Sequence, residues 1–142
     1  MARRVVLDTN VVVSALRSGR GASAAVLLAV GTGGFETCIS VALLLEYGSA
    51  VKRPEAGIRV GNEAIDDILD YLASVAHRQE VYFLWRPGLP DPADDHVLEV
   101  AVAGGCDAIV TYNLRDFRGA ERYGVRAVSP AEFLRELRSE GA

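Results

Sequence analysis

The chain has 142 residues, of which 50% are hydrophobic and 24% charged, so one globular domain over residues 1–142 is expected and a disordered chain is excluded. The formal net charge of -4 argues against coating nucleic acid through bulk positive charge, but it leaves room for an enzyme acting on nucleic acid. The amino terminus lacks the apolar segment of a signal peptide, and no apolar run reaches the roughly 20 residues of a membrane span. Two cysteines in apolar contexts, Cys38 and Cys106, indicate no disulfide framework and fit a reducing cytoplasm.

The predicted secondary structure alternates short apolar strands with helices. In chain order we expect a strand at 3–8, helices at 10–16 and 22–30, a strand at 35–39, helices at 41–52 and 62–76, a strand at 81–84, a helix at 93–103, strands at 107–111 and 126–128, and a helix at 130–138. Asn10, Ser40, Asn62 and Ser129 are the candidate helix caps. This alternation predicts an α/β three-layer sandwich, with a central, mainly parallel sheet and helices on both faces.

Four acidic residues lie beside apolar segments that should build the core: Asp8, Glu46, Asp95 and Asp116. Carboxylates in such places cost free energy unless something neutralises them. Sites in parallel sheets form outside the carboxyl ends of the strands, so the topology favours convergence of these groups. Together they would form an oxygen-rich pocket for a hard divalent cation, which points to metal-dependent hydrolysis.

Two of these acids also have structural explanations. Asp8 and Asn10 stand at a strand-to-helix turn, where helix caps are common. Glu46 has the small or apolar helical neighbours Ala42 and Leu43, which favours a partner or a metal for its carboxylate. The alternative is an exposed glutamate on a helix whose buried face is elsewhere.

The acids Asp91, Asp94 and Asp95 cluster at a helix start. The helix dipole favours negative charge there, which explains one or two of them. Three acids with His96 adjacent are more than a cap needs. In a helix, Asp95 shares a face with apolar residues and points nearer the core than Asp94 does.

The loop after the 107–111 strand offers oxygen atoms from Thr111, Asn113 and Asp116. An ordinary polar loop is the alternative interpretation. Nearby arginines could meet phosphates or simply be solvated surface: Arg115, Arg118 and Arg122. Arginine dominates the fifteen basic residues, which suits phosphate contacts but also fits a genome rich in arginine codons.

Taken together, these segments resemble the PIN-domain ribonucleases, most closely the VapC-like toxins of bacterial and archaeal toxin–antitoxin pairs. The resemblance covers essentially the whole chain, through Val5–Asn10, the helical Glu46, Asp95 and the segment 110–117. It implies an endoribonuclease that depends on Mg²⁺ or Mn²⁺. Asp8, Glu46, Asp95 and Asp116 would then be the catalytic residues and would hold one or two metal ions, directly or through water.

The resemblance also implies supporting residues and partners. The residues expected to support the metal or touch the substrate are Thr9, Asn10, Asp94, Thr111, Asn113 and Arg115. Many relatives carry an aspartate at the position of Asn113, so the position of the fourth acid rests on Asp116 alone. The expected partners are the RNA substrate, a cognate antitoxin and a second copy of the chain in a homodimer.

Two other functions remain open from the sequence. A housekeeping PIN nuclease in RNA processing would use the same chemistry as a toxin. A catalytically silent PIN domain that binds RNA or protein belongs to a different class, and weak metal binding by a folded chain would favour it.

Overall fold

A five-stranded parallel sheet forms the centre of the computed structural model, which describes residues 3–81 and 89–141. The strands in these ranges are β1 (Arg3–Leu7), β2 (Phe35–Ile39), β3 (His77–Arg78), β4 (Ala108–Val110) and β5 (Arg126–Val128). The α-helices are α1 (Thr9–Ser18), α2 (Ala22–Ala29), α3 (Val41–Val51), α4 (Asn62–Val75), α5 (Asp95–Ala103) and α6 (Pro130–Gly141). Short 3₁₀ helices are η1 (Pro54–Ala56), η2 (Pro92–Asp94), η3 (Leu114–Phe117) and η4 (Ala120–Tyr123).

The strand order is β3-β2-β1-β4-β5, and every neighbouring pair is parallel. β1 occupies the centre because Val5, Val6 and Leu7 form an unbroken apolar run that is buried on both faces. The chain first builds outward from β1 to β2 and β3, then returns to the other side of β1 with β4. Such a reversal opens a crevice at the carboxyl ends of the two strands, here between β1 and β4.

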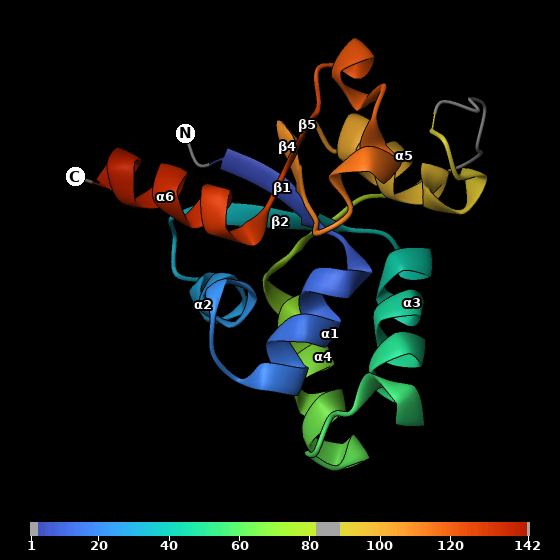
Figure 1. The fold of residues 1–142 in the computed structure, drawn as a ribbon, viewed down its shortest axis with the longest axis vertical. Coiled ribbons are helices and arrows are strands. Elements are labelled where there is room, and N and C mark those ends of the chain that lie inside the picture. The colour runs from blue at the N-terminus through green and yellow to red at the C-terminus, as the bar shows by residue number, and fades with distance from the viewer. Residues whose placement is uncertain (1–2, 82–88, 142) are drawn as a thin grey trace.

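Helices cover both faces of the sheet, so the expected three-layer α/β sandwich is confirmed. Figure 1 shows α5 on one side of the sheet and α1 and α2 on the other, with α3 beside the end of β2. Helix α6 packs back on the sheet through Phe133, whose ring meets Phe35 of β2 edge-to-face at 5.0 Å between centroids. Aromatic pairs of this geometry add stabilisation beyond the area that they bury.

The predicted helix caps are partly correct. Ser40 accepts a hydrogen bond from the Leu43 amide at 3.1 Å, and Ser129 accepts one from the Glu132 amide at 3.1 Å, as predicted. The cap of α1 is Asp8 rather than Asn10, because the helix begins at Thr9 and the Asp8 carboxylate accepts the Thr9 amide. Asn62 is the first residue of α4 and Gly61 takes the cap position.

The third strand differs from the prediction. The sequence predicts a strand at 81–84, but Val81 is not in a strand and residues 82–84 lie outside the described residues. The structure instead pairs His77 and Arg78 with Cys38 and Ile39 of β2. Two polar residues directly after a helix carry no apolar alternation, so the pattern that predicts strands passes over them.

Within residues 3–81 and 89–141, no single helix is both long and apolar enough to cross a membrane. Helices α1 and α2 pass that test only as a pair, by length and composition, and the pair is bent by 104°.

Candidate functional site

The candidate site lies in the crevice where β1 and β4 end. The Asp8 amide continues the ladder by donating to the Val110 carbonyl at 2.9 Å, which sets the carboxyl ends of the two strands side by side. Asp8 therefore follows β1 at the same level at which Thr111 follows β4. The sheet brings together two polar groups that are separated by 103 residues in the chain.

The Asp8 carboxylate is buried and fixed by hydrogen bonds at both oxygens. Oδ1 accepts the Thr9 amide at 2.9 Å, and Oδ2 accepts the hydroxyl of the fully buried Thr111 at 2.8 Å. Burial raises the pKa of the Asp8 carboxyl, although the hydrogen bonds from Thr111 and Thr9 oppose this rise. The charge of Glu46 also raises it, so the two carboxylates lie close enough to repel each other.

The Glu46 carboxylate is held from two elements other than its own helix. Oε2 accepts the hydroxyl of Thr9 on α1, and Oε1 is 3.0 Å from Nε2 of His96 on α5. A carboxylate on an apolar stretch of helix was expected to need a partner, and the structure supplies two. The predicted acids Asp8 and Glu46 are thus joined through Thr9, which contacts both.

Tyr47 fixes the backbone under the site. Its hydroxyl donates to the carbonyl of Leu7, the residue directly before Asp8, and its side chain is 2% exposed. Burial, together with the charges of Asp8 and Glu46, raises the pKa of the phenol, so it remains a donor at physiological pH. No motif in the sequence predicts a role for Tyr47. Its position next to Glu46, in a helix with few other polar groups, was the only available signal.

Asp94 and Asp95 occupy different environments. Asp95 is 6% exposed and its Oδ1 accepts the Leu89 amide at 3.2 Å in a buried contact, so this carboxylate fixes the segment before α5. Asp94 is half-buried, and burial together with the charges of neighbouring carboxylates raises its pKa to about 6. The carboxylates that raise it are Asp8, Asp116, Asp91 and Glu46. The acid group that surrounds the crevice therefore includes Asp94 directly, whereas the contact recorded for Asp95 faces inward.

The segment after β4 borders the same crevice. Thr111 Oγ1 accepts the Asn113 amide at 2.9 Å while it donates to Asp8, so one hydroxyl connects the two ends. Asn10 accepts the Tyr112 amide at 3.3 Å and ties α1 to this segment. The side chains of Asn113 and Arg115 are exposed and remain free to meet a ligand, and Asp116 is half-buried near Asp94.

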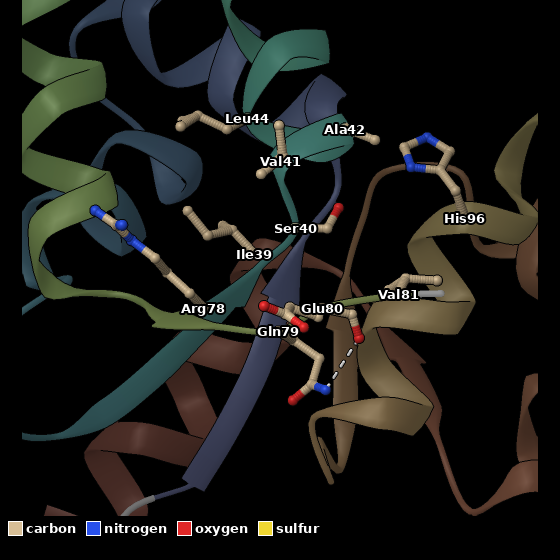
Figure 2. Close-up of a pocket in the computed structure, with 10 residues that line it drawn as sticks. All are labelled: Ile39, Ser40, Val41, Ala42, Leu44, Arg78, Gln79, Glu80, Val81 and His96. Carbon is tan, nitrogen blue, oxygen red and sulfur yellow. Dashed lines mark hydrogen bonds between the residues drawn. The ribbon is translucent and has the colours of Figure 1, made fainter. Parts of the chain in front are cut away.

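A pocket of about 830 Å³ opens beside the acidic crevice, between the start of α3 and the chain that follows β3. Figure 2 shows Val41, Ala42 and Leu44 along one side, with Val81 and the His96 ring on another. His96 therefore belongs to both features, since its ring lines the pocket and its Nε2 contacts Glu46.

The acidic side chains are suitable metal ligands by type, but among the described residues they are not arranged as a coordination site. In residues 3–81 and 89–141, no three His, Cys, Asp or Glu side chains form a group that could hold a metal ion. The carboxylates are nevertheless hard oxygen donors, and burial together with the charges of the neighbouring carboxylates raises the pKa of Asp94. The residues present therefore fit a divalent cation by charge and donor type.

Comparison with protein families agrees with this architecture. The PIN domain model matches residues 4–115, which is most of the chain. The chain belongs to the PIN domain family, and a nuclease-type function follows from that membership. No curated protein matches the chain.

Proposed function

We propose that the protein is a metal-dependent endoribonuclease that hydrolyses phosphodiester bonds of RNA in the crevice between β1 and β4. The observation that carries the proposal is the group of acids around Asp94, whose pKa rises to about 6 through burial and through the charges of Asp8, Asp116, Asp91 and Glu46. Acids that repel one another destabilise the fold unless a ligand of opposite charge binds between them. In a metal-dependent nuclease, that ligand is a divalent cation.

The proposed cation ligands are Asp8, Glu46, Asp94 and Asp116. Sequence reasoning placed Asp95 in this group, and the inward contact of Asp95 with the Leu89 amide favours Asp94 in its place. A bound Mg²⁺ or Mn²⁺ would activate water and offset charge on the scissile phosphate. The hydrogen bonds from Thr9 and Thr111 hold the carboxylates of Asp8 and Glu46 in fixed orientations, which lowers the cost of binding.

The proposed substrate contacts come from the exposed rim. Arg115 and Asn113 lie next to the acids in the segment after β4, where a guanidinium can meet a backbone phosphate. A net charge of -4 makes such local contacts more important than the overall field of the protein.

The test is cleavage of a set of unpaired and structured RNAs with Mg²⁺, Mn²⁺ or EDTA. We expect metal-dependent cleavage by the wild type and its loss in Asp8→Asn and Asp94→Asn. Asp95→Asn is the informative comparison, because it should lower the melting temperature at pH 7, whereas Asp94→Asn should raise it. Cleavage that persists in EDTA, or that is equal in wild type and Asp8→Asn, would contradict the proposal.

We further propose that the nuclease is the toxin of a toxin–antitoxin pair. Support comes from the apolar side chains Val41 and Leu45 on α3, which are 77% and 68% exposed beside the pocket and suit a protein partner. Induced expression should arrest growth, and Asp8→Asn should not. Normal growth with active enzyme would favour the housekeeping nuclease.

The same surface supports the proposed homodimer. Leu45→Glu should convert a dimer to a monomer in light scattering while the far-UV circular dichroism stays unchanged. A wild-type protein that is monomeric at all concentrations would contradict the homodimer, and the apolar surface of α3 would then be proposed to bind only the antitoxin.

A further inference from the structure

His96 is the neighbour of the acidic group that the proposed chemistry does not use. It is the second residue of α5, and its Nε2 reaches Oε1 of Glu46 at 3.0 Å, across 50 residues of sequence. The side chain of His96 is 21% exposed and that of Glu46 is 39% exposed, so the contact is only partly shielded from water. The pair is therefore a partly buried contact that links α5 to α3.

The contact completes the fixation of Glu46. A carboxylate held at one oxygen still rotates about its last torsion, which is a soft one. With Thr9 at Oε2 and His96 at Oε1, both oxygens have a donor and the plane of the carboxylate is set. Because the two donors come from α1 and α5, the orientation of Glu46 follows the packing of three helices.

The surroundings of the ring define which nitrogen carries hydrogen. The Glu46 carboxylate only accepts, so Nε2 must be the donor. Nδ1 is buried, and the described part of the chain offers it no hydrogen-bond partner. A buried N–H without an acceptor costs free energy comparable to a lost hydrogen bond, whereas the lone pair of the other tautomer costs less. The ring is thus best accommodated as the Nε2–H tautomer, a pure donor to Glu46.

We propose that His96 is a positioning residue of the nuclease site, which orients the Glu46 carboxylate toward the cation through the Nε2–H donor. The inference rests on the proposed function, because it assigns His96 a role in that same site. His96 touches neither substrate nor metal, and it acts only through Glu46. Figure 2 shows the ring at the edge of the pocket, where it stands clear of Ser40 and Val41.

The test uses two substitutions of nearly equal size. His96→Gln keeps an N–H donor near the position of Nε2, and His96→Met removes it with little change in volume. We expect His96→Met to lower kcat by roughly 10- to 100-fold, the loss typical of an outer-shell partner, with KM for RNA changed by less than about two-fold. His96→Gln should recover most of the lost kcat.

Two further readouts separate positioning from general damage. In a Glu46→Ala background, His96→Met should cause no additional loss, because its target is gone. Titration calorimetry with Mn²⁺ alone should show weaker binding for His96→Met than for the wild type, and near wild-type binding for His96→Gln.

Equal losses in the Gln and Met variants, or a further loss in the Glu46→Ala background, would overturn the inference. If the folded wild type cleaves no RNA, the Mn²⁺ titration decides alone. Weaker binding for Met and not for Gln then upholds the role of His96 while the ribonuclease proposal falls, and equal Mn²⁺ binding by all three proteins overturns the inference.

Discussion

The two ends of the sheet treat charge in opposite ways. At the amino ends of β1 and β5, Arg3 and Arg126 both bind Glu136 at 2.9 Å, and Arg3 also reaches Asp107 at 3.4 Å. At the carboxyl ends the acids gather instead, and the described chain pairs none of the four acids Asp8, Glu46, Asp94 and Asp116 with an arginine or lysine. Within residues 3–81 and 89–141, His96 is the basic side chain that contacts one of them, namely Glu46.

This difference separates residues that hold the fold from the acids that we propose bind a cation. The paired end lowers the pKa of Glu136, chiefly through the hydrogen bond from Arg126, so its charge stabilises the fold. At the unpaired end, burial and the charges of the neighbouring acids raise the pKa of Asp94, so its charge destabilises the fold. A protein keeps such a cost where function needs it.

The largest expected effect is the loss of cleavage when the unpaired end is changed. Asp8→Asn keeps the volume of the side chain and removes its charge. Loss of a residue that merely supports a metal ligand costs up to about 100-fold in activity, so loss of a ligand itself should lower RNA cleavage by at least about 100-fold. The matched control is Glu136→Gln, the same chemical change at the paired end, which should leave cleavage within about two-fold of wild type. Similar losses in both variants would erase the distinction between the two ends.

The next effect is a loss of stability at the paired end. Arg3 is 13% exposed in its side chain, and its guanidinium also lies 5.1 Å from the ring of Phe133. Arg3→Met should lower the free energy of unfolding by about 2 kcal/mol in urea titration, because it leaves charged partners partly buried. The neighbouring Arg4 is 38% exposed, and Arg4→Met should cost only about 0.5 kcal/mol. Equal costs would show that burial does not set the strength of these pairs.

The smallest effect is an opposite pH dependence of stability at the two ends. The pKa of Asp94 rises from 3.8 to about 6, so protonation favours the fold and stability is lost as pH rises through this interval. The pKa of Glu136 falls below 4.5, so its contribution is present above that value and is lost as pH drops through the folded pKa.

Melting temperatures measured without metal would show this contrast. Asp94→Asn should raise Tm at pH 7 and leave it nearly unchanged at pH 4, by a modest amount because Asp94 is half-exposed to screening water. Glu136→Gln should lower Tm at pH 7 and have less effect at pH 3. A change in Tm of the same sign for both variants at pH 7 would contradict the contrast between the two ends of the sheet.

The sequence predicts the fold well because its signals are local. Buried runs such as Val5–Leu7 and Ala108–Val110 have no polar alternation, which indicates parallel strands covered on both faces. Because β1 and β4 are adjacent and parallel, the residues that follow them, Asp8 and Thr111, lie side by side at the same edge of the sheet. Strand β3 is not predicted, because His77 and Arg78 form a strand only through pairing with β2. No local sequence pattern indicates that pairing.

The details of the site are harder to predict because they depend on contacts distant in sequence. Asp94 and Asp95 are adjacent, and which one faces the crevice depends on the turn η2 that precedes α5. The hydrogen bond between His96 and Glu46 joins two helices whose relative position is set only by the packed core. A single sequence indicates the type of residue at the site and the end of the sheet, but not these orientations.

The central claim is that the carboxyl end of the sheet holds a divalent cation and the amino end does not. The most direct test is the melting temperature of wild type, Asp8→Asn and Glu136→Gln at pH 7 as Mn²⁺ is added, because a ligand that binds only the folded state raises Tm. We predict that added Mn²⁺ raises the Tm of the wild type, raises the Tm of Glu136→Gln equally from a lower starting value, and changes the Tm of Asp8→Asn little or not at all. No rise in the wild type at millimolar Mn²⁺, or an equal rise in Asp8→Asn, would contradict it.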